Sequence, residues 1–129
     1  MGVECKFLEQ GKGAEILATG VVRGQEVIAA LREIYDPRHL DRQEYQIVDK
    51  SHCTEYAVTA DEIATIAEVD RQASLVNPNI VIAVIESHHL QFSLTELWQA
   101  HLGDCVFPTK SFQSRGAAMQ WIAEHRVGH

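Results

Sequence analysis

Two adjacent residues, His52 and Cys53, are of the types that nucleophilic catalysis uses. A cysteine attacks as the thiolate, and a neighbouring histidine or helix N-terminus lowers the pKa of its thiol. Neighbours in an extended segment point to opposite faces, however, so these side chains cannot form a catalytic hydrogen bond within a strand. Cysteine is also among the residue types most often buried. We therefore expect a structural Cys53, and catalysis by this pair is the less favoured alternative.

Metal binding is the second chemistry that the residue types raise. His88 and His89 follow an apolar run, and His52 and His101 lie elsewhere in the chain. Zinc sites have characteristic spacings such as HExxH or paired CxxC, and neither occurs in this sequence. Seven histidines in 129 residues give an adjacent pair by chance often enough. We expect no metal site and no cofactor.

Asp70 is the third candidate group. It follows Ile66 by four residues and precedes Ala73 by three, which places it on or beside the apolar stripe of a helix. A carboxylate buried there must be paired or hydrogen-bonded, or its pKa must rise. No partner can be identified in the sequence. The favoured interpretation is a residue at the edge of the stripe that reaches solvent, and catalysis by Asp70 is a weaker alternative.

The segment DKSHCTEYAVTADE leads from an apolar strand into a helix, and we expect it to form a sharp corner. Thr59 and Glu62 have the S/T-x-x-E spacing of a capping box, in which each side chain bonds the backbone amide of the other residue. Asp49 is expected to serve the turn. Glu55 and Tyr56 are expected in an exposed loop, where they could contact a partner or a ligand.

Hydrophobic periodicity and turn residues predict the elements that position these groups. The expected strands are 3–9, 14–20, 44–51, 77–87 (a turn, then a strand covered on both faces) and 104–112; the expected helices are 24–36, about 60–76, one opening at Ser93 and ending before Gly103, and one capped by Ser114. Pro108 in the last strand predicts an edge position, because proline cannot donate to a ladder. Strands that alternate with helices need parallel crossovers. We predict one α/β domain over residues 1–129, with an N-terminal antiparallel hairpin, a mixed sheet of about five strands and about four helices.

Composition narrows the classes of function. The net charge of −7 and the 11 scattered basic residues disfavour nucleic acid and anionic lipid as partners. The longest apolar run, IVIAVI, is too short to span a bilayer. The three cysteines are widely separated, and no secretory leader is recognisable, so we expect free thiols in a reducing cytoplasm. The sequence contains no GxxxxGK[ST], GxGxxG or GxSxG motif that would indicate a reaction class.

Three features are shared with a known family: the element order with an N-terminal hairpin, the phrase IVDKSHCTEYAVTADEIATIA, and the ending FQSRGAAMQWI. On these features the chain resembles the STAS superfamily, and within it the SpoIIAA-like bacterial proteins. The resemblance implies a STAS-type fold over nearly the whole chain. In signalling members the corner reads Asp-Ser-Ser-Gly, and a partner kinase phosphorylates the first serine. Val58 stands at that place here and has no hydroxyl.

Thr59 is the adjacent hydroxyl and the remaining candidate for phosphorylation. Its role as helix N-cap is a sufficient reason for a threonine at this position. The leading hypothesis is a non-enzymatic STAS-like regulatory module that binds another protein, or a second copy of itself as a homodimer. Glu55, Tyr56 and Thr59 would make the contacts at the corner.

The alternative hypothesis is a small-molecule or lipid binder. Its apolar crevice would lie near His88, Leu90, Phe92 and Trp98, and would need a volume of roughly 300 Å³ or more. The least favoured hypothesis is an enzyme that uses His52, Cys53 or Asp70.

Overall fold

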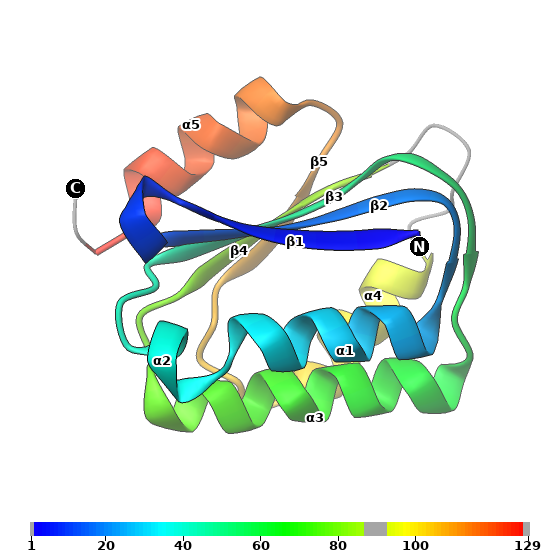
Figure 1. Ribbon diagram of the computed structural model, residues 1–129, viewed down its shortest axis with the longest axis horizontal. Coiled ribbons are helices and arrows are strands. Elements are labelled where there is room, and N and C mark those ends of the chain that lie inside the picture. Colours follow the sequence, from blue (N-terminus) through cyan, green and yellow to red (C-terminus); the bar gives the residue numbers. More distant parts are fainter. Residues whose placement is uncertain (1, 87–92, 128–129) are drawn as a thin grey trace.

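The computed structural model describes residues 2–86 and 93–127 as an α/β fold on one five-stranded sheet (Figure 1). The strands are β1 (Val3–Leu8), β2 (Gly13–Arg23), β3 (Tyr45–Ala57), β4 (Val81–Ile85) and β5 (Thr109–Phe112). The helices are α1 (Gly24–Ile34), α2 (Pro37–Leu40), α3 (Ala60–Val76), α4 (Ser93–Leu102) and α5 (Arg115–His125), with a 3₁₀ turn at Glu9–Gly11. The predicted mixed α/β fold with an N-terminal hairpin is confirmed.

The strands follow one another across the sheet in the order β1-β2-β3-β4-β5. β1 and β2 are antiparallel, whereas β2, β3, β4 and β5 are parallel to one another. Parallel neighbours must be joined by crossovers, and α1, α3 and α4 lie in the three crossovers. Figure 1 shows these three helices on one face of the sheet and α5 on the other. The face with three helices encloses the larger core.

α5 is held to the sheet by a smaller apolar core and by ion pairs near both of its ends. At its start, Arg115 pairs with Glu15 of β2 at 2.6 Å and with Asp49 of β3 at 3.4 Å. Beyond its end, Arg126 pairs with Glu44 at 2.6 Å. The apolar packing fixes the face that α5 presents, and the arginines fix its position along the sheet.

β3 is longer than predicted and continues to Ala57, so the expected corner over residues 49–62 is wrong for most of its length. The chain stays extended because β2 also continues, to Arg23, and pairs with β3 along this stretch. Their register is interrupted after Leu17 and after Gly20, and β3 holds one extra residue at each interruption. Gly20 has a φ of +62°, which glycine adopts without steric cost. Bulges of this kind change the direction of neighbouring side chains.

α3 begins at the predicted residue and buries the predicted helix face. The hydroxyl of Thr59 accepts a hydrogen bond from the Glu62 amide at 3.1 Å, and the Glu62 carboxylate accepts one from the Thr59 amide at 3.0 Å. The capping box is therefore complete. The residues predicted to face inward are all buried: Ile63, Ile66, Ala67 and Ala73.

The predicted helix 24–36 forms as α1, and a second short helix follows it. α1 ends at Ile34, and the short α2, which the periodicity did not predict, starts at Pro37. Asp36 caps α2, because its carboxylate accepts from the amide of Arg38 at 2.9 Å. Proline ended one helix, as expected, and also began the next, where its missing N–H has no cost.

β5 is confirmed as an edge strand, although it begins only at Thr109, after Pro108. Ser114 caps α5 as predicted. Gly103 follows α4 with a φ of +54°, the left-handed conformation expected after a helix. None of the helices in the described part of the chain is both long enough and apolar enough to cross a lipid bilayer.

Candidate functional site

A small chamber lies between the sheet and the helices α1, α3 and α4, with a cavity volume of about 40 Å³. Most of its lining is apolar. Six side chains in the lining carry polar atoms: Gln46, Lys50, Tyr56, Asp70, Thr95 and Trp98. Its lining includes Val84, the residue before the last of β4, and Lys50, the residue after the last one of β3 that pairs with β4, so the chamber lies toward the carboxyl end of β4. Ligands of α/β sheets commonly bind at the carboxyl ends of strands.

Lys50 enters the chamber from an irregular part of β3. It lies between the two β3 residues that pair with Leu17 and Thr19, where β3 holds an extra residue. The residue is only 7% exposed. Its ammonium donates to Thr95 Oγ1 at 3.3 Å and lies 4.3 Å from the centre of the Tyr56 ring. An ammonium has three N–H donors, so one long hydrogen bond and one ring face leave Lys50 incompletely satisfied among the described residues.

Glu86 directly follows β4 and is also buried. Its carboxylate accepts hydrogen bonds from the hydroxyls of Thr95 and Ser111. The Thr95 hydroxyl therefore bridges two charges, because it accepts from Lys50 and donates to Glu86. Burial lowers the pKa of Lys50, and the negative charge of Glu86 opposes that change. The two buried charges are coupled through a neutral hydroxyl.

Asp70 is 1% exposed and connects three helices. One carboxylate oxygen accepts at 2.6 Å from the hydroxyl of Tyr35, which directly follows α1, and the other accepts from Trp98 Nε1 of α4 at 2.8 Å. The prediction that Asp70 reaches solvent is wrong, because α4 packs over this side of α3. Burial raises the pKa of Asp70 to about 6, and the two hydrogen bonds limit the rise. Asp70 therefore behaves as expected of a buried acid: it is hydrogen-bonded and its pKa is raised. Its two partners are far away in the sequence.

Comparison with known proteins identifies a solved structure with a similar fold. No family model matches the sequence, and no curated protein matches it. Among solved structures, the chain is similar to an uncharacterised protein of the DUF3478 family with a SpoIIAA-like fold, from Shewanella loihica PV-4. The TM-score is 0.50 and the identity is 13%, over 93% of this chain and 91% of that chain. This chain has a SpoIIAA-like fold. The likeness confirms the fold that the STAS resemblance implied and concerns the fold alone.

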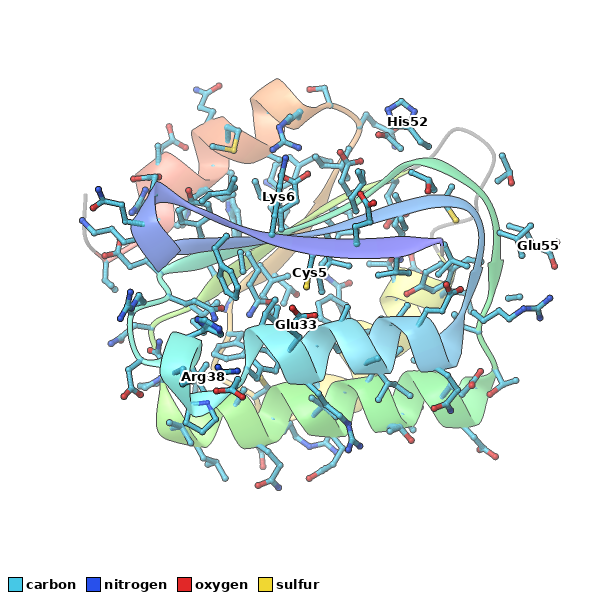
Figure 2. All side chains as sticks on the ribbon, viewed as in Figure 1. Cys5, Lys6, Glu33, Arg38, His52 and Glu55 are labelled. Carbon is cyan, nitrogen blue, oxygen red and sulfur yellow. The ribbon has the colours of Figure 1, made fainter. Side chains whose placement is uncertain are left out.

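In this SpoIIAA-like chain, the side chains of His52 and Cys53 have different environments. This agrees with the prediction that neighbours in a strand point to opposite faces of the sheet. Cys53 is buried in the larger core, where its thiol lies 3.4 Å from the carbonyl oxygen of Glu55. Burial raises the pKa of the Cys53 thiol. Figure 2 shows His52 on the α5 side of the sheet and Glu55 on the outside of the molecule. The two side chains do not form a catalytic pair.

The residues predicted to form an interaction corner do not lie together in a loop. Glu55 is exposed but belongs to β3. Tyr56 is half-buried and turns its ring toward Lys50, so its placement in an exposed loop is wrong. Burial raises the pKa of Tyr56. Thr59 is engaged in the capping box. Of these residues, only Tyr56 contributes to the chamber.

Asp49, which was expected to serve a turn, lies inside β3. Its Oδ1 accepts from the amide of Ser51 at 2.9 Å and from its hydroxyl at 2.6 Å. Its Oδ2 lies 3.4 Å from Arg115. Asp49 therefore stabilises the irregular part of β3 next to Lys50, because it accepts two hydrogen bonds from Ser51 there.

The predicted crevice is described only in part. His88, Leu90 and Phe92 lie outside the described residues, whereas Trp98 lines the chamber. In the described parts of the chain, no group of three or more His, Cys, Asp or Glu residues is placed to hold a metal ion.

The sequence reasoning missed five residues of the site: Tyr35, Gln46, Lys50, Glu86 and Thr95. Two of them carried a visible signal, because Glu86 directly follows an apolar strand run and Lys50 follows Asp49 at the end of another. Thr95 precedes Trp98 by three residues and so shares its helix face. Tyr35 carried no signal beyond its place at the end of an apolar stripe.

Proposed function

We propose that this SpoIIAA-like chain is a non-enzymatic binding module and that its ligand site is the chamber. The observation that supports this most strongly is the enclosed ammonium of Lys50, which faces a cavity with one hydrogen bond of 3.3 Å. Enclosing a charge costs several kcal/mol unless partners compensate for it. Buried, perturbed charges beside a cavity are typical of functional sites.

The hydrogen bonds of the chamber favour binding over catalysis. Asp70 is held by two donors, and Glu86 is held by two hydroxyls. Groups held in this way are fixed in position and well suited to recognise a ligand. The buried thiol of Cys53 has a raised pKa, which disfavours the nucleophilic thiolate.

The size of the chamber limits the ligand. Pockets for drug-sized molecules hold roughly 300–1,000 Å³. The chamber holds about 40 Å³, so its volume gives no support to the predicted lipid ligand. A ligand of a few non-hydrogen atoms is the size that the present walls admit.

Two tryptophans provide an internal comparison for a test. The Trp98 indole lies at the chamber, whereas Trp121 lies on α5 with its ring centre 5.6 Å from that of Phe112. A library of small polar fragments is titrated into ¹⁵N-labelled protein, and the two indole N–H signals are followed. We expect members of the library to shift the Trp98 signal saturably and to leave the Trp121 signal in place. If no fragment shifts the Trp98 signal selectively, the proposal is contradicted.

Self-association is a second candidate function, favoured by one feature of α3. Leu75 and Val76 at its end are 79% and 64% exposed. Val76 also lines a groove of about 820 Å³ between α3 and the segment of α1 and α2. The lining combines apolar residues such as Pro37, Leu40 and Val69 with charged ones such as Arg32, Asp36 and Glu68. In a two-fold dimer the same surface of both copies meets, so the protruding Leu75 of one copy can enter the partly apolar groove of the other.

Sedimentation velocity over a wide range of concentrations tests the dimer. We expect the mass of the native chain to rise above the monomer value of 14.4 kDa as the concentration rises. The double variant Leu75→Ser, Val76→Ser is expected to stay monomeric, and the control Met119→Ser on α5 is expected to behave like the native chain. A native chain that is monomeric throughout would exclude this candidate.

A further inference from the structure

The chamber has unused hydrogen-bonding capacity of both signs. Lys50 has three donors and, among the described residues, one acceptor, Thr95. Asp70 accepts one hydrogen bond on each carboxylate oxygen, and each oxygen has a second lone pair. Both side chains line the same cavity. A ligand between them can accept from one and donate to the other.

The two charged side chains in the lining, Lys50 and Asp70, have opposite signs, which favours a neutral ligand with one polar group for each. The cation of Lys50 is balanced by the carboxylate of Glu86 through the Thr95 hydroxyl. The carboxylate of Asp70 has two neutral donors as its hydrogen-bonding partners. An anionic ligand would add another negative charge to this enclosed space, and a cationic ligand would have to lie near the ammonium. Both are unfavourable where the dielectric constant is low.

The volume and the walls define the rest of the ligand. A cavity that holds one water molecule needs a volume of roughly 10–15 Å³. The chamber of about 40 Å³ therefore admits a molecule of very few non-hydrogen atoms. The apolar remainder of the lining, which includes Ile16, Ile66 and Val84, offers contact to carbon rather than to further polar atoms.

We propose that the chamber binds a small neutral molecule with one hydrogen-bond acceptor and one donor, of which an amide is the simplest. Its carbonyl oxygen accepts from Lys50, and its N–H donates to Asp70. This inference rests on the proposed binding function and adds the chemical class of the ligand.

Formamide, formate and formamidinium test the class, because they share one planar shape and differ in charge. Each is titrated into ¹⁵N-labelled protein at constant ionic strength, with Trp98 as the reporter and Trp121 as the reference. Formamide is expected to shift the Trp98 signal saturably, with a Kd of about 1 mM or weaker, as its few atoms allow. The two ions are expected to bind at least about tenfold more weakly.

Substitution of Lys50 tests the anchor. The variant Lys50→Met is expected to weaken formamide binding about tenfold or more, because the carbonyl loses its donor. The matched control is Lys6→Met, since Lys6 is exposed on β1 and points to the α5 side of the sheet in Figure 2. This control is expected to bind formamide like the native chain. The comparison of the three probes on the native chain does not depend on whether either variant folds.

The outcomes separate the ligand class from the proposed function. Formate or formamidinium binding at least as tightly as formamide would overturn the class and leave the chamber as a ligand site. Unchanged formamide affinity in Lys50→Met would also overturn the inference. If none of the three probes shifts Trp98 selectively while other fragments do, the class alone fails. If the fragment library is silent as well, the chamber holds only water and both proposals fail.

Discussion

Trp98 and Asp70 are joined by a hydrogen bond of 2.8 Å between the indole Nε1 and a carboxylate oxygen, deep in the larger core. This bond fastens α4 to α3, and the Tyr35 hydroxyl fastens α1 to the same carboxylate. One acid thus connects the three helices that form the walls of the chamber. Burial of the charged form has a cost, and that cost makes the stability of the fold depend on pH.

Replacing Asp70 by Asn is expected to remove this pH dependence. The pKa of Asp70 is about 6 in the folded chain, against about 3.9 in an unfolded chain. The folded state therefore binds this proton more tightly. The free energy of unfolding falls as the pH rises from about 4 to about 6, and the contribution is constant above that range.

The difference in pKa corresponds to about 3 kcal/mol. Urea unfolding of the native chain and of Asp70→Asn at about pH 4 and about pH 7 measures it. Between these values, the native chain is expected to lose about 2 kcal/mol relative to the variant, because part of the difference is expressed only below pH 4. Parallel pH profiles for the two proteins would show that Asp70 is not the buried acid described here.

Arg115 is expected to contribute strongly to the docking of α5. The variant Arg115→Met leaves Glu15 and Asp49 without their cation, although both carboxylates are largely buried. Removing one partner of a fully buried pair costs roughly 3–5 kcal/mol, and about half of Arg115 is solvent-exposed, so we expect about 2 kcal/mol.

The matched control for this change is Arg38→Met. The Arg38 side chain is 80% exposed and pairs with Asp36 on the surface of α2. We expect no measurable change in the free energy of unfolding, since exposed pairs contribute little. Equal losses for both arginine variants at neutral pH would contradict the structural account of α5.

Thr59 is expected to act as a helix cap and not as a phosphate acceptor. Thr59→Ala should lower the free energy of unfolding by about 1 kcal/mol, because the Glu62 amide loses its acceptor. The control is Thr65→Ala at an exposed position inside α3, where alanine is the better helix former and no loss is expected.

The phosphorylation hypothesis is tested separately on the native chain. The Glu62 carboxylate lies 3.2 Å from the Thr59 hydroxyl, so a phosphate there would meet a like charge. Incubation with candidate kinases is expected to give no mass shift at Thr59. A phosphorylated Thr59 would instead support the regulatory switch implied by the STAS resemblance.

The three cysteines, none of which forms a disulfide in the described structure, should differ in reactivity. Cys53 is fully buried and is expected to react with a thiol reagent only as fast as the chain unfolds. Cys5 is half-buried and, as Figure 2 shows, lies near Glu33; burial and that carboxylate raise its pKa to about 11. We expect labelling followed by mass spectrometry to give the order Cys105, Cys5, Cys53. Rapid labelling of Cys53 would reopen the catalytic alternative.

Local signals in the sequence predicted the parts of the fold that depend on neighbouring residues. The capping box of Thr59 and Glu62 and the inward stripe of α3 need only contacts within one helix, and both are confirmed. The length of β3 was underestimated because it depends on pairing with β2 across two bulges. A bulge adds one residue to a strand and puts the later side chains out of phase, so the simple alternation no longer marks the strand.

The chamber could not be predicted for a similar reason. Asp70 has partners 35 and 28 residues away, in Tyr35 and Trp98, so its burial depends on how three helices pack. Lys50 faces the chamber from one of the interruptions in the β3 register, a position that alternation alone cannot assign. The residue types that matter were present in the sequence, but their proximity is a product of tertiary structure.

The central claim, that the chamber presents the Lys50 ammonium to a ligand, is tested most directly by an NMR titration of the Lys50 side chain with and without saturating formamide. In the free protein we expect a pKa below the ordinary value of 10.5, because the ammonium is buried. In the complex we expect a higher pKa, because an accepted hydrogen bond stabilises the charged form. A pKa that is ordinary in the free protein, or that does not change when formamide saturates the Trp98 signal, would contradict the claim.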